Sequence, residues 1–287
     1  MRRSFGIAAF VMALAVLVVL FLSLRPAVGF RMPFAAISRW TQLTVAAPGG
    51  KLYSGSGSAP APGIRKVVVD VPSIGAVQLA TGPAGSVSWN WTVTGPRQGA
   101  VRSRASGAVL VLTFTPALPR QLEIGSAQEG LRVTLPPGLA ASVSVATGAA
   151  KVYGSYRSLA AHVTTGALSI QDFSGKLTAD VDTGPLDVQA AAVQGVLRLQ
   201  VGTGPLNFSG DPGLASSFSV GTGPLTLRLA PSGQLAVHAA AHLGPLSSGY
   251  PGLPGGTNGV FRGTIGHGPR GTLSVDDGTG PVSITPQ

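Results

Sequence analysis

Apolar and polar residues alternate along most of this chain. From about Ile64 onward, short runs such as HVTTGALSI and DVDTGPLDV place apolar side chains at every second position, as strands with one buried face do. Glycine and proline interrupt the runs, and nothing after residue 40 shows a helical period of 3.6 residues. The pattern predicts an all-β domain over residues 64–287.

The alternating runs recur around a Thr-Gly step. Regular copies begin at Thr147, Thr165, Thr183, Thr203 and Thr222, so their separations are 18, 18, 20 and 19 residues. A variant follows at Leu243–Gly244 after 21 residues, and Thr279–Gly280 follows after 36 more, close to two further turns. In every regular copy a valine stands two residues before the threonine, and apolar pairs such as Leu186/Val188 follow the step.

The spacing of the apolar positions changes phase at each step. Val181 and Thr183 are two residues apart, whereas Thr183 and Leu186 are three apart. Such a jump is expected at a corner between two strands of a coil. The predicted corner residues are Thr183, Gly184, Pro185, Thr203, Gly204, Pro205, Thr222, Gly223 and Pro224. We therefore expect a single-stranded parallel β-solenoid, similar to a β-helix, with rungs of 18–20 residues; a β-sandwich is the alternative, but it would not require this period.

Stacking is also what the energetics of one rung require. A rung offers roughly four large apolar side chains, each contributing about 1.5–3 kcal/mol when buried. Ordering its backbone costs about 1–2 kcal/mol per residue. A single rung is therefore unstable, and neighbouring rungs must bury one another's side chains and pair their backbones.

The N-terminal region predicts a membrane segment. Phe5–Leu24 holds no charged residue and is bounded by Arg2–Arg3 and Arg25; as a helix it would be about 30 Å long, which matches a bilayer core. We expect residues 1–25 to be an anchor, residues 26–63 a juxtamembrane segment ending in the spacer SGSGSAPAPG, and residues 64–287 an extracytoplasmic domain. A cleaved signal is the alternative, because Ala27 and Gly29 offer small residues for a signal peptidase.

Charge divides the chain into two parts. The net charge is +10, and residues 1–120 hold 12 Lys and Arg against one acid, Asp70. Residues 121–287 hold 8 Lys and Arg against 9 acids. A basic region beside a membrane segment would attract anionic lipid or acidic cell-wall polymers; a solvated basic surface is the plainer interpretation. There is no cysteine, which excludes disulfides and thiol chemistry.

The sequence offers little that suggests catalysis. No nucleophile elbow, phosphate-binding loop or HExxH motif is present, and the GxGxxG match at residues 266–271 precedes a strand pattern. The histidines, which are His162, His238, His242 and His267, show no ligand spacing with carboxylates. The acidic cluster Asp172, Asp180, Asp182 and Asp187 is expected on a solvated strand face, with a weak Ca²⁺ site as the alternative. We expect no enzymatic activity, no cofactor and no metal.

Two tryptophans suggest a ligand platform. Trp89 and Trp91 lie two residues apart, hence on one face of a strand, and Arg97, Arg102 and Arg104 follow nearby. Paired indoles can stack on sugar rings or sit at a membrane interface, although packing in the core or at the end of a rung is the favoured interpretation of this spacing. Nucleic-acid binding is not expected, because no recognition element accompanies the charge.

The repeats HVTTGALSI, DVDTGPLDV, LQVGTGPLNF and FSVGTGPLTL, with the closing GTLSVDDGTGPVSI, resemble the bacterial putative-adhesin domain family of unknown function. The resemblance covers about residues 65–287 and implies a β-solenoid at the cell envelope, with no catalytic residues. The expected function is thus a membrane-anchored adhesin or interaction scaffold, bound to a polymer, lipid or protein partner. A sensor of envelope stress and a polysaccharide-acting enzyme are the alternatives.

Overall fold

The structure, a computed structural model, describes residues 51–83, 85–95, 100–115, 130–230, 234–266, 268 and 270–287. All regular elements in these residues are strands, joined into one sheet in which most neighbours are parallel. This confirms the predicted all-β fold with a mostly parallel sheet. Phe5–Leu24 lies outside the described residues, among which no helix is both long and apolar enough to cross a bilayer.

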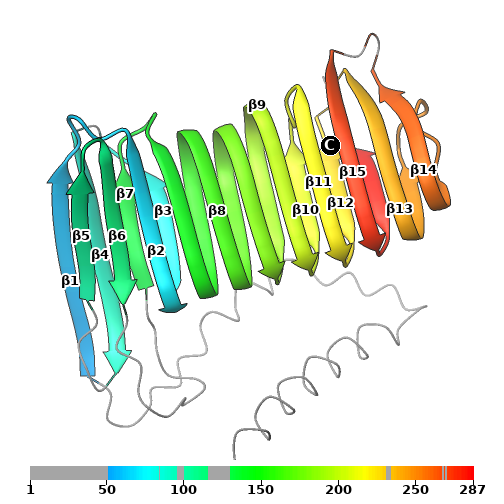
Figure 1. The fold of residues 1–287 in the computed structure, drawn as a ribbon. Helices are drawn as coiled ribbons and strands as arrows, with labels where there is room; N and C mark the ends of the chain where they lie inside the picture. Colours follow the sequence, from blue (N-terminus) through cyan, green and yellow to red (C-terminus); the bar gives the residue numbers. More distant parts are fainter. Residues whose placement is uncertain are drawn as a thin grey trace, which may run out of the picture. The chain divides into compact units, whose positions relative to one another are not determined.

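The strands, in chain order, are β1 (Lys51–Pro60), β2 (Lys66–Ile74), β3 (Ala76–Thr81), β4 (Ser86–Gly95), β5 (Ala100–Ser106), β6 (Val109–Thr115), β7 (Gly130–Leu135), β8 (Ala140–Thr183), β9 (Leu186–Thr203), β10 (Leu206–Gly210), β11 (Ala215–Thr222), β12 (Leu225–Leu229), β13 (Leu235–Ser248), β14 (Gly256–Ile265), β15 (Gly271–Thr279) and β16 (Val282–Pro286). Strands β8 and β9 are long because each bends through corners of the coil without losing its backbone pairing (Figure 1).

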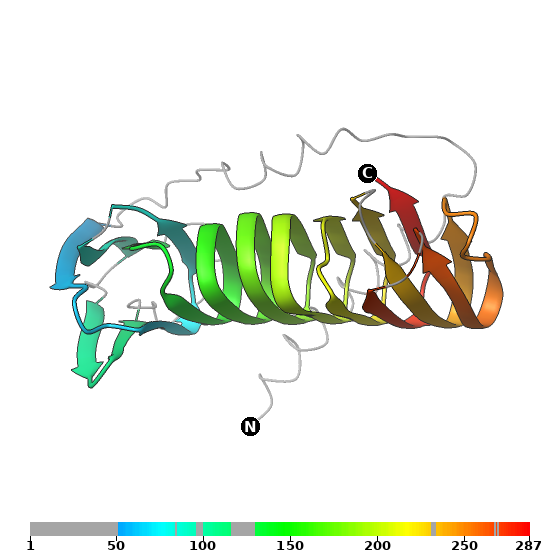
Figure 2. The same cartoon turned by 90° about the horizontal axis from the view of Figure 1, so that it is seen from above.

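Two parallel ladders build the central turns, which lie side by side in Figure 1. The first, here called the valine face, contains residues 177–183 of β8, residues 196–203 of β9, and β11. The second, the leucine face, contains residues 168–170 of β8, residues 186–190 of β9, β10 and β12. Viewed from above in Figure 2, the turns follow one another from β8 to β12.

Equivalent apolar residues stack on one another inside the coil. On the valine face Val181, Val201 and Val220 are in register, and on the leucine face Leu186, Leu206 and Leu225 are. All six are buried, with at most 1% of their surface exposed. The alternation in the sequence therefore marks residues that fill the interior of the coil, as a stacked arrangement requires.

The chain turns between the two faces at a column of glycines. The strands of the valine face end at Thr183, Thr203 and Thr222. Beyond Thr203, Gly204 has φ +138°, a backbone conformation that side chains disfavour, and a Cβ there would collide with the carbonyl oxygen of Gly184. Backbone bonds then link the corners, since the Gly184 amide donates to the Thr203 carbonyl at 2.8 Å. Glycine at this position allows the backbones of adjacent turns to approach closely.

We predict that Gly204→Ala destabilises the domain far more than Gly259→Ala. The two glycines have similar dihedrals, φ +138° and +144°, but a Cβ on Gly259 meets nothing within 4 Å. Both substitutions should incur a backbone strain of about 1–3 kcal/mol. Gly204→Ala should cost at least ~2 kcal/mol more because its Cβ collides with backbone. Urea unfolding of both variants measures the difference, and equal losses would refute the role of close packing at the corner.

The turns do not follow the order of the sequence at the C-terminal end. Each corner glycine would place a Cβ against the glycine of the preceding turn, and this order runs Gly75, Gly148, Gly166, Gly184, Gly204, Gly223, Gly280 and then Gly244. Strand β15 accordingly pairs with β11 on one side and with β13 on the other. The prediction that Thr279 lies about two turns beyond Leu243 is therefore wrong, because Thr279 is the register partner of Leu243 and lies between it and Thr222. A periodic sequence identifies the turns but not their order in space.

The predicted spacer is also wrong for Ser54–Pro60, which belongs to β1. This strand pairs antiparallel with β4, opposing Gly55 to Trp91 and Gly57 to Trp89. A Cβ on Gly55 would lie 2.6 Å from the Trp91 indole, and one on Gly57 would lie 2.5 Å from the Trp89 indole. The two indoles thus occupy the space that the glycines leave free. The aromatic side chains of the neighbouring strand cover the glycine positions of β1, where this strand has no side chain of its own to pack.

Candidate functional site

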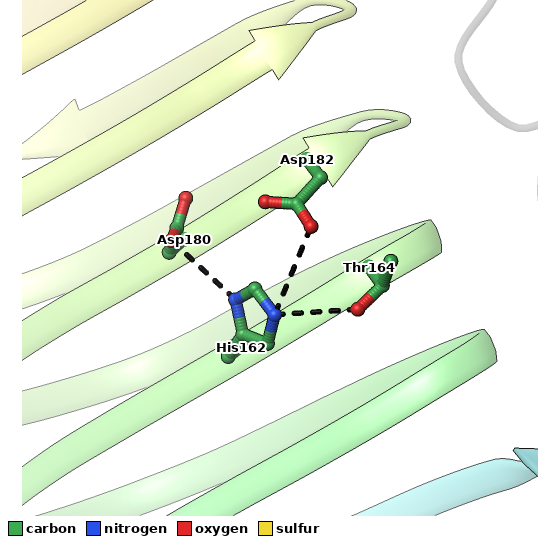
Figure 3. A network of polar contacts seen from close by, with 4 residues as sticks. All are labelled: His162, Thr164, Asp180 and Asp182. Carbon is green, nitrogen blue, oxygen red and sulfur yellow. Dashed lines mark hydrogen bonds and ion pairs between the residues drawn. The ribbon is translucent and has the colours of Figure 1, made fainter. Parts of the chain in front are cut away.

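The most connected polar cluster among the described residues lies on the outer side of the valine face, within β8. His162 and Thr164 come from one turn, and Asp180 and Asp182 come from the next (Figure 3). Val163 and Val181 are buried, so the residues on either side of them must point outward. Because the turns here are 18 residues long, the aspartates lie beside the histidine and threonine of the preceding turn.

The imidazole of His162 lies between the two carboxylates. Its Nδ1 is 3.4 Å from Asp180 Oδ2, and its Nε2 is 3.9 Å from Asp182 Oδ2. The hydroxyl oxygen of Thr164 is 3.3 Å from the same Nε2. The side chains of His162, Asp180 and Asp182 are 43%, 40% and 52% exposed, so water screens their charges.

This arrangement could hold a divalent cation. One nitrogen and two carboxylate oxygens lie within 4.8 Å of one another, and imidazole with carboxylate is a common ligand set for transition metals. However, each ring nitrogen already faces a different carboxylate, so a metal ion would have to replace at least one of these contacts. The geometry is that of a surface histidine–aspartate network.

The same cluster has the connectivity of a catalytic triad, from the Thr164 hydroxyl through His162 to Asp180. Its contacts of 3.3 and 3.4 Å are longer than those of a poised nucleophile and base. The residues lie on an open strand face, and none of them lines the groove formed in part by Gln194 and Arg270. Triad chemistry also needs donors for a developing oxyanion and a bound substrate. Nothing in the described arrangement of these residues supplies them.

The expectation that no histidine has a ligand spacing with a carboxylate is wrong for His162. The ligand spacing does not occur within one alternating run, because the relevant separation is one turn of the coil. Counting 18 residues from His162 gives Asp180, and the same count from Thr164 gives Asp182. His242 likewise approaches Asp276 from a neighbouring strand, with 3.0 Å between Nε2 and Oδ1.

The other members of the predicted acidic cluster lie elsewhere. Asp187 is on the leucine face in register with Ser169 and Asn207, where partial burial raises the pKa of its carboxyl group. Asp172 is exposed and has φ 53° at a bend of β8. The cluster is thus divided between two faces and a turn, so it does not form a four-carboxylate site.

Another carboxyl group, that of Asp277 in β15, is fully buried. Neither of its oxygens has a hydrogen-bond partner in the part of the chain that the structure describes. Burial, and next the charge of Asp276, raise the pKa of Asp277 from 3.8 to about 6, against an opposing effect of His242. The sequence held a signal for this residue, because Asp277 stands two residues before Thr279, where the regular copies have valine.

The predicted ligand platform is divided between separate groups of strands. Trp89 and Trp91 lie on the core side of β4, where Trp91 is 8% exposed and Trp89 packs against the core. Arg102 and Arg104 are exposed on β5, which pairs with β6, whereas β4 pairs with β1 and β7. Arg97 lies outside the described residues. The position of the indoles favours a packing role over stacking on a ligand.

A shallow groove opens near the connections that follow the leucine face. Its volume is about 450 Å³, and it is lined in part by Gln194, Asp211, Leu214 and Arg270. Asp211 accepts a hydrogen bond from the Gly213 amide at 2.9 Å, which stabilises its own turn. These residues do not include a nucleophile with an adjacent base.

Comparison with known proteins gives structural matches only. A "putative cell adhesion protein" from Clostridium sporogenes is 12% identical, with 83% of this chain and 100% of that chain covered and a TM-score of 0.41. A "putative adhesin" from Parabacteroides merdae is 11% identical, covering 84% and 98%, with a TM-score of 0.34. One from Bacteroides fragilis is 10% identical, covering 83% and 97%, with a TM-score of 0.28. No family model and no curated protein matches the chain.

These matches, which cover most of the chain, agree with the resemblance found in the sequence. With TM-scores below 0.5, however, they carry no argument about this chain's function.

We predict that His162→Ala and Asp182→Asn each change the free energy of unfolding by less than about 1 kcal/mol, because exposed ion pairs contribute little. Chemical unfolding measures this, with Asp187→Asn as a comparison at a more buried carboxyl group. A loss above about 2 kcal/mol for His162→Ala would show that the network supports the fold.

Proposed function

We propose that this chain is a membrane-anchored, extracytoplasmic β-solenoid that serves as a non-enzymatic interaction scaffold of the cell envelope. The main support is the register of the two faces. Inward residues fill the coil, and each outward position is matched by an outward position in the next turn at the spacing of a parallel ladder, about 4.8 Å. A rigid surface with a regular spacing suits contact with an extended partner better than catalysis on a small substrate.

A basic surface at the β2–β6–β5 strands supports an acidic partner. Outward residues of β2 are in register with those of β6, which in turn oppose β5. This brings three exposed cations onto one side, namely Lys66, Arg102 and Arg104, which we call the basic face. The one acid among the outward residues of these strands is Asp70, opposite Thr113. The basic face would attract an anionic wall polymer or lipid headgroups.

The proposed location can be tested in intact cells. We expect the protein in the membrane fraction, cleaved by protease added from outside, with a mature N-terminus near Met1 when measured by mass spectrometry. A mature N-terminus after Gly29 would indicate a cleaved signal and a released scaffold. Recovery in the cytoplasm with full protection from protease would contradict an envelope function altogether.

The basic face can be tested with the full chain in neutral-lipid nanodiscs and soluble poly(glycerol phosphate) as the acidic polymer. We expect Arg102→Gln with Arg104→Gln to weaken binding roughly two- to thirtyfold at low salt, and to make the remaining binding less dependent on salt. Arg198→Gln with Arg228→Gln is the matched control, because it removes two exposed charges from the valine and leucine faces. Equal effects of both pairs would mean that only net charge matters. No binding by the unsubstituted protein would exclude this partner.

A further inference from the structure

The turn that comes last in the sequence, residues 271–286, is inserted between two earlier turns; we call it the insert. Strands β15 and β16 lie between β11 and β12 on one side and β13 on the other (Figure 1). The corner of the insert is bonded on both sides, since the Gly223 amide donates to the Thr279 carbonyl at 2.8 Å and the Gly280 amide donates to the Leu243 carbonyl at 3.0 Å. Residues 271–286 thus fill a gap that the preceding part of the chain leaves between two turns.

The insert also joins the end of the coil to the rest. Among the described residues, β13 pairs only with β14, β15 and β16, and β14 pairs only with β13. The connection of β13 and β14 to β11 and β12 therefore depends on the insert. One additional hydrogen bond, from the Tyr250 hydroxyl to the Leu229 carbonyl at 3.1 Å, crosses this boundary. We call residues 235–287 the cap.

Asp277 occupies an interior position of the insert. It is in register with Val220 of β11 and Ala241 of β13, in the column that holds Val181 and Val201 in earlier turns. Its exposed fraction is 0%, and both carboxylate oxygens lack a hydrogen-bond partner within the described residues. A buried carboxyl group without partners disfavours its charged form, because ionisation would place a charge in an apolar interior.

The charges around Asp277 come from the outer side of the same strands. Strand β11 carries no titratable residue. Strand β13 carries His242, which is bonded to Asp276 of β15, and His238, whose register partner is Ser274. Beyond the corner, β12 carries the exposed Arg228, while β16 carries no charged residue. Among the residues that the structure describes, no cation therefore reaches the buried carboxylate as a direct partner, and the ionised form stays unfavourable in the inserted state.

We propose that the cap is a pH-sensitive latch, in which protonated Asp277 allows the insert to fill its gap and ionised Asp277 weakens the attachment of the cap. The carboxyl group binds its proton more tightly in the inserted state than in an opened state. The stabilisation of the inserted state by the proton on Asp277 is therefore complete below pH 3.8, the ordinary pKa of this carboxyl group. It is lost as the pH rises through about 6, the pKa in the inserted state. Acidification tightens the cap, and neutral or alkaline pH loosens it.

Hydrogen exchange measured by mass spectrometry on the full chain tests the latch. The measured quantity is the protection of residues 271–286 divided by that of residues 186–210 in the same sample, a ratio in which the intrinsic pH dependence of exchange cancels. From pH 5 to pH 8 we expect this ratio to fall about tenfold for the unsubstituted protein. This value follows from a pKa of about 6 for Asp277 in the inserted state and its ordinary pKa of 3.8 in the opened state. Residues 235–248 should follow the insert, because they are attached through it.

Three variants distinguish the source of the change. Asp277→Asn removes the titrating group at nearly constant shape and should abolish most of the tenfold fall. Asp277→Val restores the valine of the column; it should also abolish most of the fall, and it should give higher protection at pH 8. Asp276→Asn, at the exposed neighbour, should keep most of the pH dependence. An unchanged pH dependence in both Asp277 variants would overturn the latch and assign the effect to His242. A constant ratio in the unsubstituted protein would overturn it outright.

Discussion

The close contact between equivalent residues of neighbouring turns is the interaction on which the structure depends. Each turn has too few apolar side chains to be stable alone, so Val181, Val201 and Val220 are buried only because they lie against one another. The corner glycines belong to the same contact, since a side chain at Gly204 would separate two backbones that are hydrogen-bonded. Outward residues inherit this regularity, and the proposed role as a scaffold follows from it.

Much of the fold could be predicted from the sequence because one physical requirement, filling the interior at every turn, repeats along the chain. The alternation of apolar residues, the phase change at Thr183 and the recurring glycines all follow from this requirement. What could not be predicted were features outside the repeat. Residues 54–60 show no alternation of large apolar side chains, and Trp89 and Trp91 of the neighbouring strand cover their glycines.

The functional residues show the same division. The His162 cluster was missed because its members are far apart in the sequence, although one turn separates them; the period that predicted the coil also contained this pairing. Asp277 was also missed: it departs from the valine column, but its isolation is visible only with the strands packed on both sides of it. In a repetitive chain, a polar residue at an interior position therefore deserves more weight than a polar residue in a loop.

The inserted turn has a consequence for how the protein is made. If every turn were added in sequence order, each newly synthesised stretch could pack on the turn before it, as in a simple linear array. Here residues 235–248 can join the preceding turns only after residues 271–286 have been synthesised, because those residues form the strands that link β13 to β11 and β12. Until then β11 and β12 present an unpaired edge, which is a common route to aggregation. Completion of the C-terminal end of the domain is thus a late and long-range step.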